Sequence, residues 1–171
     1  WGVKEAGARA GVDEVYRAAL ARRGIRYLCA VRGPAEVSYA GREIGNASLA
    51  AHLLAQQRGL VIIAAHSSGS FVAHELFTEL EAMEPRGRAL LRRTVYYDLD
   101  GGESGLTPAI VGHLRRAYFV YADDSTTGTR SANAATMIEL GTRYAAAGGV
   151  LAVNASRSGC QPGAKWCLHD A

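Results

Sequence analysis

The chain has 171 residues, of which 49% are hydrophobic and 20% are charged, and its formal net charge at pH 7 is +3. This length and composition are typical of a single folded domain spanning residues 1–171, and they exclude a disordered chain. No apolar run approaches the ~18 residues of a membrane span. The arginines are scattered rather than gathered in a basic stripe with aromatic residues, so we expect no nucleic-acid binding.

The spacing of apolar residues predicts the elements. Apolar positions at three- and four-residue intervals indicate helices, and continuous apolar runs indicate strands that are buried on both faces. The expected elements are a helix over 12–20, a strand over 25–31, a helix after the capping residues 46–48, a strand over 60–65, a helix from Phe71, a strand over 94–99, a short helix opened by Thr107 and Pro108, a strand over 117–122, a helix over 131–147 and a strand over 150–153. Strands that alternate with helices predict an α/β fold with a mostly parallel sheet and helices on both faces.

The three cysteines are too few for a disulfide scaffold. Cys29 lies in an apolar run, and we expect it to be buried. Cys160 and Cys167 flank a loop with glycine and proline, where a disulfide would hold the loop's shape, although free thiols are the alternative. A zinc site from these two cysteines and His169 lacks a fourth ligand. A disulfide would indicate an exported protein, secreted or periplasmic, and without it a cytoplasmic location stays open.

The most informative segment is Ala65-His66-Ser67-Ser68-Gly69, between the strand over 60–65 and the next helix. A sharp turn from strand to helix crowds the positions two before and two after its apex, where Ala65 and Gly69 fit. Such a turn exposes the Ser67 hydroxyl above the sheet and directs the helix N-terminus toward it. The alternative interpretation is a plain loop in which these serines cap the helix.

This segment resembles the nucleophile elbow Gly-x-Ser-x-Gly of the α/β-hydrolase superfamily, with Ala65 in place of the first glycine. In the order of strands and helices, the resemblance extends from about Arg26 to His169. It implies a three-layer sandwich and an esterase- or lipase-like serine hydrolase that needs no cofactor or metal. Ser67 would be the nucleophile of a catalytic triad.

The superfamily places its catalytic residues in the order serine, acid, histidine. His169 follows the last strand by a loop, where the resemblance implies the general base, with the loop between the two cysteines positioning it. His74 lies inside the helix that follows the serine turn, and His113 lies near the end of a short helix. We expect structural roles for both.

Three aspartates could be the acid. Asp123 is the first choice and Asp124 its alternate, because they follow the strand over 117–122, the commoner location in the superfamily. Asp100 is a second alternate, because it follows the strand over 94–99, where some lipases of the superfamily carry their acid.

The oxyanion hole is expected to use two backbone N–H groups. One belongs to Ser68, directly after the nucleophile. The resemblance implies a second donor near the start of the chain, at Gly2 or Trp1. The strand that should precede that loop is not in the sequence, so we expect the domain to lack an amino-terminal strand.

Two other functions are compatible with parts of the sequence. Asp98 and Asp100 after a strand also resemble the opening motif of Mg²⁺-dependent haloacid-dehalogenase-like phosphatases. Only twenty-two residues separate Asp100 from Asp123, however, and no lysine lies between them, whereas that family requires one. A non-catalytic binding domain of the same fold is the other alternative.

The expected substrate is a small-molecule ester. The segments between motifs are short, which predicts an open site without a large lid and favours small or surface-accessible esters. The same triad also serves thioesters, lactones and peptides. The sequence leaves the acyl-chain preference and the oligomeric state open.

Overall fold

The computed structural model describes residues 21–24, 51, 55, 58–103, 105–155 and 160–169. The helix expected over 12–20 and the strand expected over 25–31 lie outside these residues, as does nearly all of the helix expected after residue 48. Gly2 and Cys29 also lie outside the described part of the chain.

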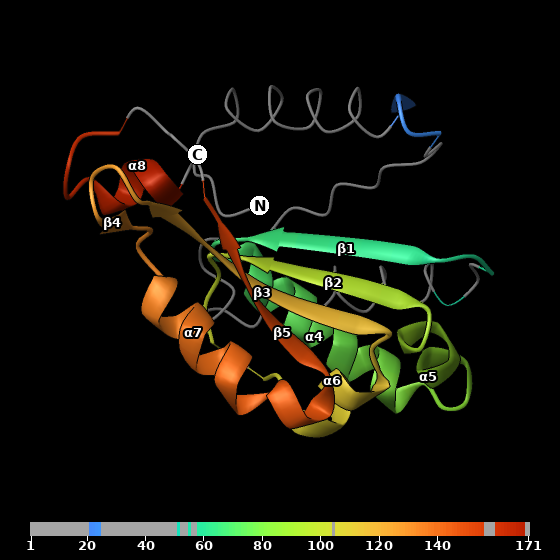
Figure 1. Ribbon diagram of the computed structural model, residues 1–171. Coiled ribbons are helices and arrows are strands. Elements are labelled where there is room, and N and C mark those ends of the chain that lie inside the picture. The colour runs from blue at the N-terminus through green and yellow to red at the C-terminus, as the bar shows by residue number, and fades with distance from the viewer. Residues whose placement is uncertain are drawn as a thin grey trace.

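A five-stranded sheet organises the described residues (Figure 1). Its strands are β1 (Val61–His66), β2 (Thr94–Leu99), β3 (Arg116–Asp124), β4 (Thr129–Arg130) and β5 (Gly149–Asn154). The four longer strands are parallel, with the spatial order β1-β2-β3-β5, and β4 pairs antiparallel with the end of β3. The parallel strands therefore all end at one edge of the sheet. The α/β class and the mostly parallel sheet are confirmed.

Helices connect these strands or follow the last of them. They are α4 (Gly69–Ala82), α5 (Arg86–Leu91), α6 (Pro108–His113), α7 (Ala134–Arg143), the short 3₁₀ helix η1 (Ala145–Ala147) and α8 (Lys165–His169). As expected, α6 begins at Thr107 and Pro108, and the Thr107 hydroxyl accepts a hydrogen bond of 3.2 Å from the Ile110 N–H. None of the helices in the described part of the chain has the length and apolar character to cross a membrane.

The helix expected over 131–147 is shorter in the structure. It begins at Ala134. The Ser131 hydroxyl and the Asn133 N–H donate hydrogen bonds to the Asp100 carboxylate, and these bonds hold the residues before Ala134 outside the helix. It ends at Arg143, and the following turn closes at Gly148, which has a left-handed φ of 94°. The elements α5, β4 and α8 were not expected from the sequence.

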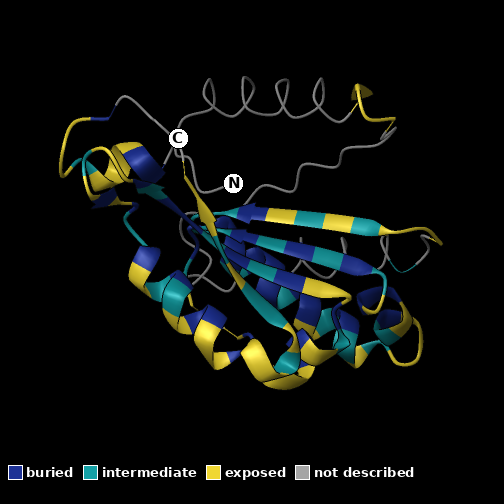
Figure 2. Ribbon diagram, viewed as in Figure 1, coloured by how far each residue is buried: buried dark blue, intermediate teal, exposed yellow. Residues whose placement is uncertain are grey.

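One face of the sheet carries the core. Tyr96 of β2 is fully buried and packs edge-on against Phe77 of α4, with 4.9 Å between ring centroids. Phe119 lies on the same face of β3 and stacks on Tyr144, at the end of α7. The buried residues are accordingly concentrated between the sheet and these helices (Figure 2). This face of the sheet, together with the helices packed on it, therefore holds most of the buried residues described.

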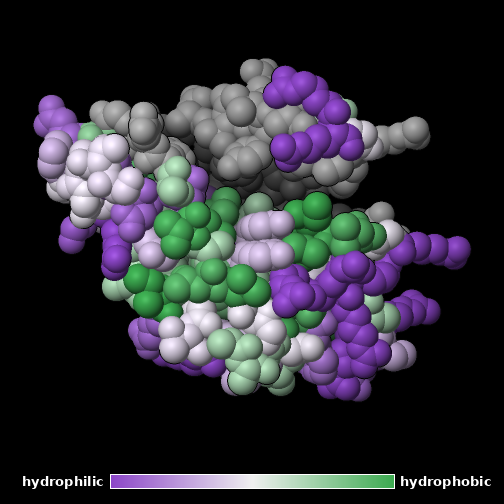
Figure 3. Space-filling model, in the orientation of Figure 1, coloured by the Kyte–Doolittle hydropathy of each residue, from purple (hydrophilic) through white to green (hydrophobic). Residues whose placement is uncertain are grey.

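The opposite face is less buried. Along β2, buried residues alternate with half-buried ones, as expected when one face is more exposed than the other. On the more exposed face Tyr97 stacks on Tyr118, with 4.9 Å between ring centroids. Ile62 of β1 is 50% exposed. Hydrophobic side chains gather over the strands on the face shown in Figure 3.

Candidate active site

Ser67 stands at the tight turn between β1 and α4. Its φ is 55°, in the left-handed region that non-glycine residues rarely adopt. Hydrogen bonds hold it there: the Ser67 N–H donates to the Leu99 carbonyl at 3.1 Å, and the Ser70 N–H donates to the Ser67 carbonyl at 3.1 Å. Ala65, which precedes the turn, is buried. A strained serine between a strand and a helix is the backbone geometry expected of the elbow.

Ser68 caps the helix that follows. Its backbone has helical angles, with φ −62° and ψ −11°, and its side chain makes no capping hydrogen bond. The start of α4 carries the positive end of the helix dipole. The Ser70 and Phe71 N–H groups donate to the Ser67 and Ser68 carbonyls, so the donor expected for an oxyanion at this end is the Ser68 N–H. Gly2, the other expected donor, lies outside the described residues.

A buried histidine–aspartate pair lies at the same edge of the sheet. His169 Nδ1 lies 2.5 Å from Asp100 Oδ2, and the side chains are only 5% and 6% exposed. Asp100 follows β2 directly and has a left-handed φ of 46°. The Ser131 hydroxyl donates to Asp100 Oδ1 at 2.6 Å, and the Asn133 N–H donates to Oδ2 at 3.2 Å. The carboxylate is thus oriented by three donors.

The same hydrogen bonds control the charge of Asp100. Burial by itself would raise the pKa of this carboxyl group, but the hydrogen bonds from His169, Ser131 and Asn133 lower it, and the net direction is downward. Asp100 is therefore ionised at neutral pH and can accept a hydrogen bond from the N–H at His169 Nδ1. An ionised carboxylate at this nitrogen leaves Nε2 free to take up a proton.

Ser70 connects the serine turn to the loop that carries Asp100. Its hydroxyl donates to the Ser67 carbonyl at 2.8 Å and accepts from the Gly102 N–H at 2.8 Å. A Cβ on Gly101 would lie 2.7 Å from the Ser70 Cβ and 2.0 Å from Asp98 Oδ1, so only glycine fits there. These contacts hold the two loops at a fixed separation.

The expected disulfide between Cys160 and Cys167 is confirmed, and it anchors α8. Leu168 is buried, and the Thr129 hydroxyl accepts a hydrogen bond of 2.7 Å from the Gly163 N–H in the same loop. His169 is the last residue of α8 and is buried by these contacts. Its ring meets the exposed Trp166 edge-on, with 5.2 Å between centroids.

His66 joins His169 to the serine turn. His66 Nε2 lies 2.6 Å from the His169 carbonyl oxygen, and the two rings have centroids 4.6 Å apart. Because His66 directly precedes Ser67, these contacts bring the histidine–aspartate pair beside the turn. Sequence reasoning treated His66 only as a variable position of the motif.

The structure pairs His169 with Asp100 and not with Asp123 or Asp124. Asp123 Oδ2 lies 3.3 Å from Arg130 Nε, and Asp124 accepts from the Thr126 N–H at 2.9 Å. Strand β3 continues to Asp124, beyond its expected end, and pairs there with β4. Both carboxylates are thereby used by the β3–β4 turn. The two glycines after Asp100, which allow its loop to fold tightly against Ser70, were a signal in its favour.

His74 and Asp98 form a second buried pair, which sequence reasoning missed. His74 Nε2 lies 3.3 Å from Asp98 Oδ2 and 3.1 Å from the Tyr96 hydroxyl. Asp98 is fully buried, and burial raises its pKa. In the phosphatase alternative Asp98 would attack phosphorus, but in this position its carboxylate does not reach the surface. His113, the other histidine considered, has its Nδ1 2.9 Å from Oε2 of Glu81, which lies near the C-terminal end of α4.

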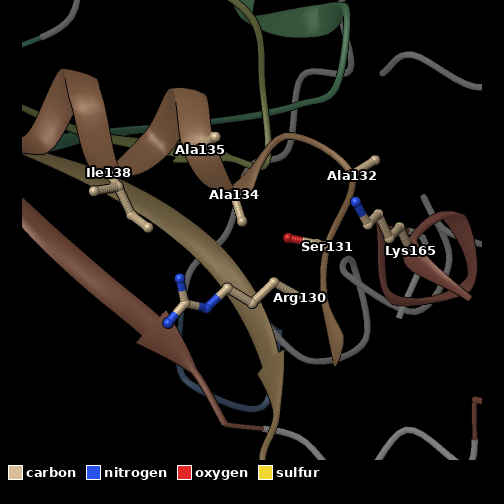
Figure 4. Close-up of a pocket in the computed structure, with 7 residues that line it drawn as sticks. All are labelled: Arg130, Ser131, Ala132, Ala134, Ala135, Ile138 and Lys165. Carbon is tan, nitrogen blue, oxygen red and sulfur yellow. The ribbon is translucent and has the colours of Figure 1, made fainter. Parts of the chain in front are cut away.

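A pocket of about 390 Å³ includes Ser131, the residue whose hydroxyl donates to Asp100 (Figure 4). It lies between the start of α7 and α8. Its lining residues are Arg130, Ser131, Ala132, Ala134, Ala135, Ile138 and Lys165. Ser131 therefore both lines the pocket and donates to Asp100. Within the described ranges, no group of three or more histidine, cysteine or acidic side chains could hold a metal ion.

Comparison with known proteins gives no match. No family model matches the chain, and no curated protein or solved structure matches it.

Proposed function

We propose that the chain is a serine hydrolase that cleaves carboxylic esters, with an α/β-hydrolase-like three-layer fold. Ser67 is the nucleophile, His169 the general base and Asp100 the acid of the triad. The observation that carries this proposal is the buried pair of His169 and Asp100, in which His169 contacts His66, the residue directly before a serine in a left-handed turn. A serine hydroxyl needs a neighbouring base, and the base needs a partner that fixes its tautomer.

The proposed reaction proceeds through an acyl-enzyme. Ser67 Oγ attacks the carbonyl carbon of the ester as its proton moves to His169 Nε2. The Ser68 N–H stabilises the resulting oxyanion. His169 then donates the proton to the departing alcohol oxygen, and the C–O bond of the ester breaks. Water, deprotonated by His169, attacks the acyl-enzyme and releases the acid, which restores Ser67.

The proposed substrates are small or surface-accessible esters. The loops after β1 and β2 are short, and the described residues contain no large insertion at this edge of the sheet. A site of this kind favours short acyl chains. Activity that rises steadily with the chain length of p-nitrophenyl esters would contradict this preference. The disulfide between Cys160 and Cys167 supports an exported location for the enzyme.

The first test is labelling by a fluorophosphonate, which reacts with activated serines. The native chain should gain the mass of one probe, and Ser67→Ala should gain none. Alanine tolerates the left-handed φ about as well as serine, so this variant should fold. Ser125→Ala, at an exposed turn, is the matched control and should label like the native chain. A folded native chain that is not labelled would contradict the hydrolase proposal and favour a non-catalytic domain.

A further inference from the structure

His66 makes contacts that the triad does not explain. It is the last residue of β1, and its Nε2 lies 2.6 Å from the carbonyl oxygen of His169. A carbonyl oxygen only accepts hydrogen bonds, so His66 Nε2 carries the proton and donates. The carbonyl groups in the last turn of a helix have no acceptor role within the helix. His66 therefore satisfies a carbonyl at the end of α8 with a side chain from β1.

The two imidazole rings also pack on each other. Their centroids are 4.6 Å apart, and their planes are inclined by 38°. Asp100 holds the ring of His169 at Nδ1, which leaves rotation about that hydrogen bond as a possible movement. Contact with the His66 ring on one side and with the edge of Trp166 on another opposes this rotation. Asp100 thus fixes one atom of the ring, whereas His66 restrains its plane and its backbone.

The position of His66 in the chain makes these contacts significant. His66 and Ser67 are joined by one peptide bond, whereas Ser67 and His169 are 102 positions apart in the sequence. α8 has only five residues, too few to be stable as a helix without tertiary contacts. The hydrogen bond from His66 to the His169 carbonyl therefore fixes the separation of Ser67 and His169 directly, whereas other connections between these two residues run through the strands of the sheet.

We propose that His66 is a positioning residue, which holds His169 so that its Nε2 faces Ser67. This inference rests on the proposed function, because it concerns the geometry of the same nucleophile and base. Two properties of His66 are required: the Nε2 donor, which fixes the backbone of His169, and the flat ring, which restrains its imidazole. The donor is the more important, because displacing the backbone would displace the whole side chain.

The test compares three substitutions of His66. His66→Ala removes the donor and the ring, His66→Phe keeps a ring without the donor, and His66→Gln keeps an N–H donor at a similar distance from the backbone. We expect the rate of fluorophosphonate labelling and kcat for p-nitrophenyl acetate to fall ~10- to 100-fold in His66→Ala, with KM within ~2-fold, because a displaced base slows the chemical step. His66→Gln should recover most of this loss, and His66→Phe should not.

His113→Ala is the matched control, because His113 is also a half-buried histidine bound to one acceptor, Glu81, away from the site. It should label at the native rate. If the native chain labels and His66→Ala labels equally fast, His66 has no positioning role, although the hydrolase proposal stands. If His66→Ala fails to fold, the test rests on His66→Gln and His66→Phe. Equal rates of fluorophosphonate labelling in these two variants would overturn the inference. Failure of the native chain to label would instead contradict the proposed function itself.

Discussion

Asp98 and Asp100 are two residues apart, and their carboxyl groups behave in opposite ways. Asp98 points into the core between β2 and α4, where burial raises its pKa. Asp100 lies just past the end of β2, where hydrogen bonds from His169, Ser131 and Asn133 outweigh burial and lower its pKa. Burial thus disfavours the charged form of Asp98, whereas hydrogen-bond donors favour the charged form of Asp100, so only Asp100 is suited to support a base.

Replacement of Asp100 tests its role directly. Asp100→Asn should lower kcat ~10³- to 10⁴-fold, because an amide can turn its N–H toward His169 Nδ1 and select the wrong tautomer. Asp123→Asn should leave kcat within ~2-fold, since Asp123 binds only Arg130 among the contacts described above. Steady-state hydrolysis of p-nitrophenyl acetate measures both. A large decrease in kcat for Asp123→Asn, with a normal kcat for Asp100→Asn, would instead indicate that Asp123 is the acid of the triad.

At the scale of elements, the fold depends on how closely α4 and α5 approach each other, and the position of His169 depends on how α8 is anchored. Gly87 of α5 lies against α4, where a Cβ would be 1.7 Å from the Leu80 carbonyl oxygen. Because that neighbour is backbone, it cannot move aside without displacing the helix that follows Ser67. The anchoring of α8 is different, since it combines the disulfide and the buried Leu168 with hydrogen bonds of His169 to His66 and Asp100.

The contact between α4 and α5 can be tested with one methyl group. Gly87→Ala should lower the free energy of unfolding by about 1–3 kcal/mol, because the added Cβ overpacks the helix contact. Gly112→Ala is the matched control in α6, where no atom lies within 4 Å of the added Cβ. It should raise the free energy of unfolding by about 0.4–1 kcal/mol, since alanine has less freedom in the unfolded chain. Urea denaturation measures both, and an undisturbed Gly87→Ala would mean that the two helices are not in close contact.

Reduction of the disulfide should affect both stability and labelling. The bond joins residues seven positions apart, and closure of so short a loop contributes about 2 kcal/mol in the chain-entropy model. Because His169 lies on α8, reduction with dithiothreitol should also slow fluorophosphonate labelling of Ser67. Cys29→Ser controls for the remaining thiol and should respond to the reductant like the native chain. A reduced protein that labels at the native rate would show that α8 holds its position without the bond.

At the scale of the whole molecule, the parallel sheet gathers the site. Parallel strands end at a common edge, so residues after β1 and β2 become neighbours although the chain passes through two helices between them (Figure 1). The stability of the domain also depends on this edge, because the buried pair of His169 and Asp100 connects α8 to the sheet. Stability and the proposed activity therefore share the same contacts.

This link predicts how stability depends on pH. The pKa of Asp100 is lower in the folded than in the unfolded chain, so its contribution is present above the ordinary carboxyl pKa and is lost as pH falls through the lowered value. The native chain should therefore exceed Asp100→Asn in free energy of unfolding by more at pH 6 than at pH 3. Urea denaturation at the two pH values measures the difference. A gap that is constant, or that widens in acid, would mean that Asp100 is not stabilised in its ionised form.

The sequence alone determined the elements with a strong local signal. The predicted bounds of β2 are those of the structure, and the predicted run over 60–65 differs from β1 by one residue at each end. The disulfide was also predicted, because its two cysteines flank one short loop. These features depend on neighbouring residues, on apolar runs and on glycine and proline, which a sequence displays directly.

Only the tertiary structure decided which groups meet. Asp100, Asp123 and Asp124 all follow predicted strands, so spacing alone did not distinguish them; the choice came from Ser131 and Asn133, which approach Asp100 from the residues just before α7. The contact of His66 with His169 and the buried pair of His74 and Asp98 were likewise absent from any local pattern. Local spacing determines where strands and helices form, whereas the partner of a side chain depends on segments that are distant in sequence and become neighbours only when the sheet assembles.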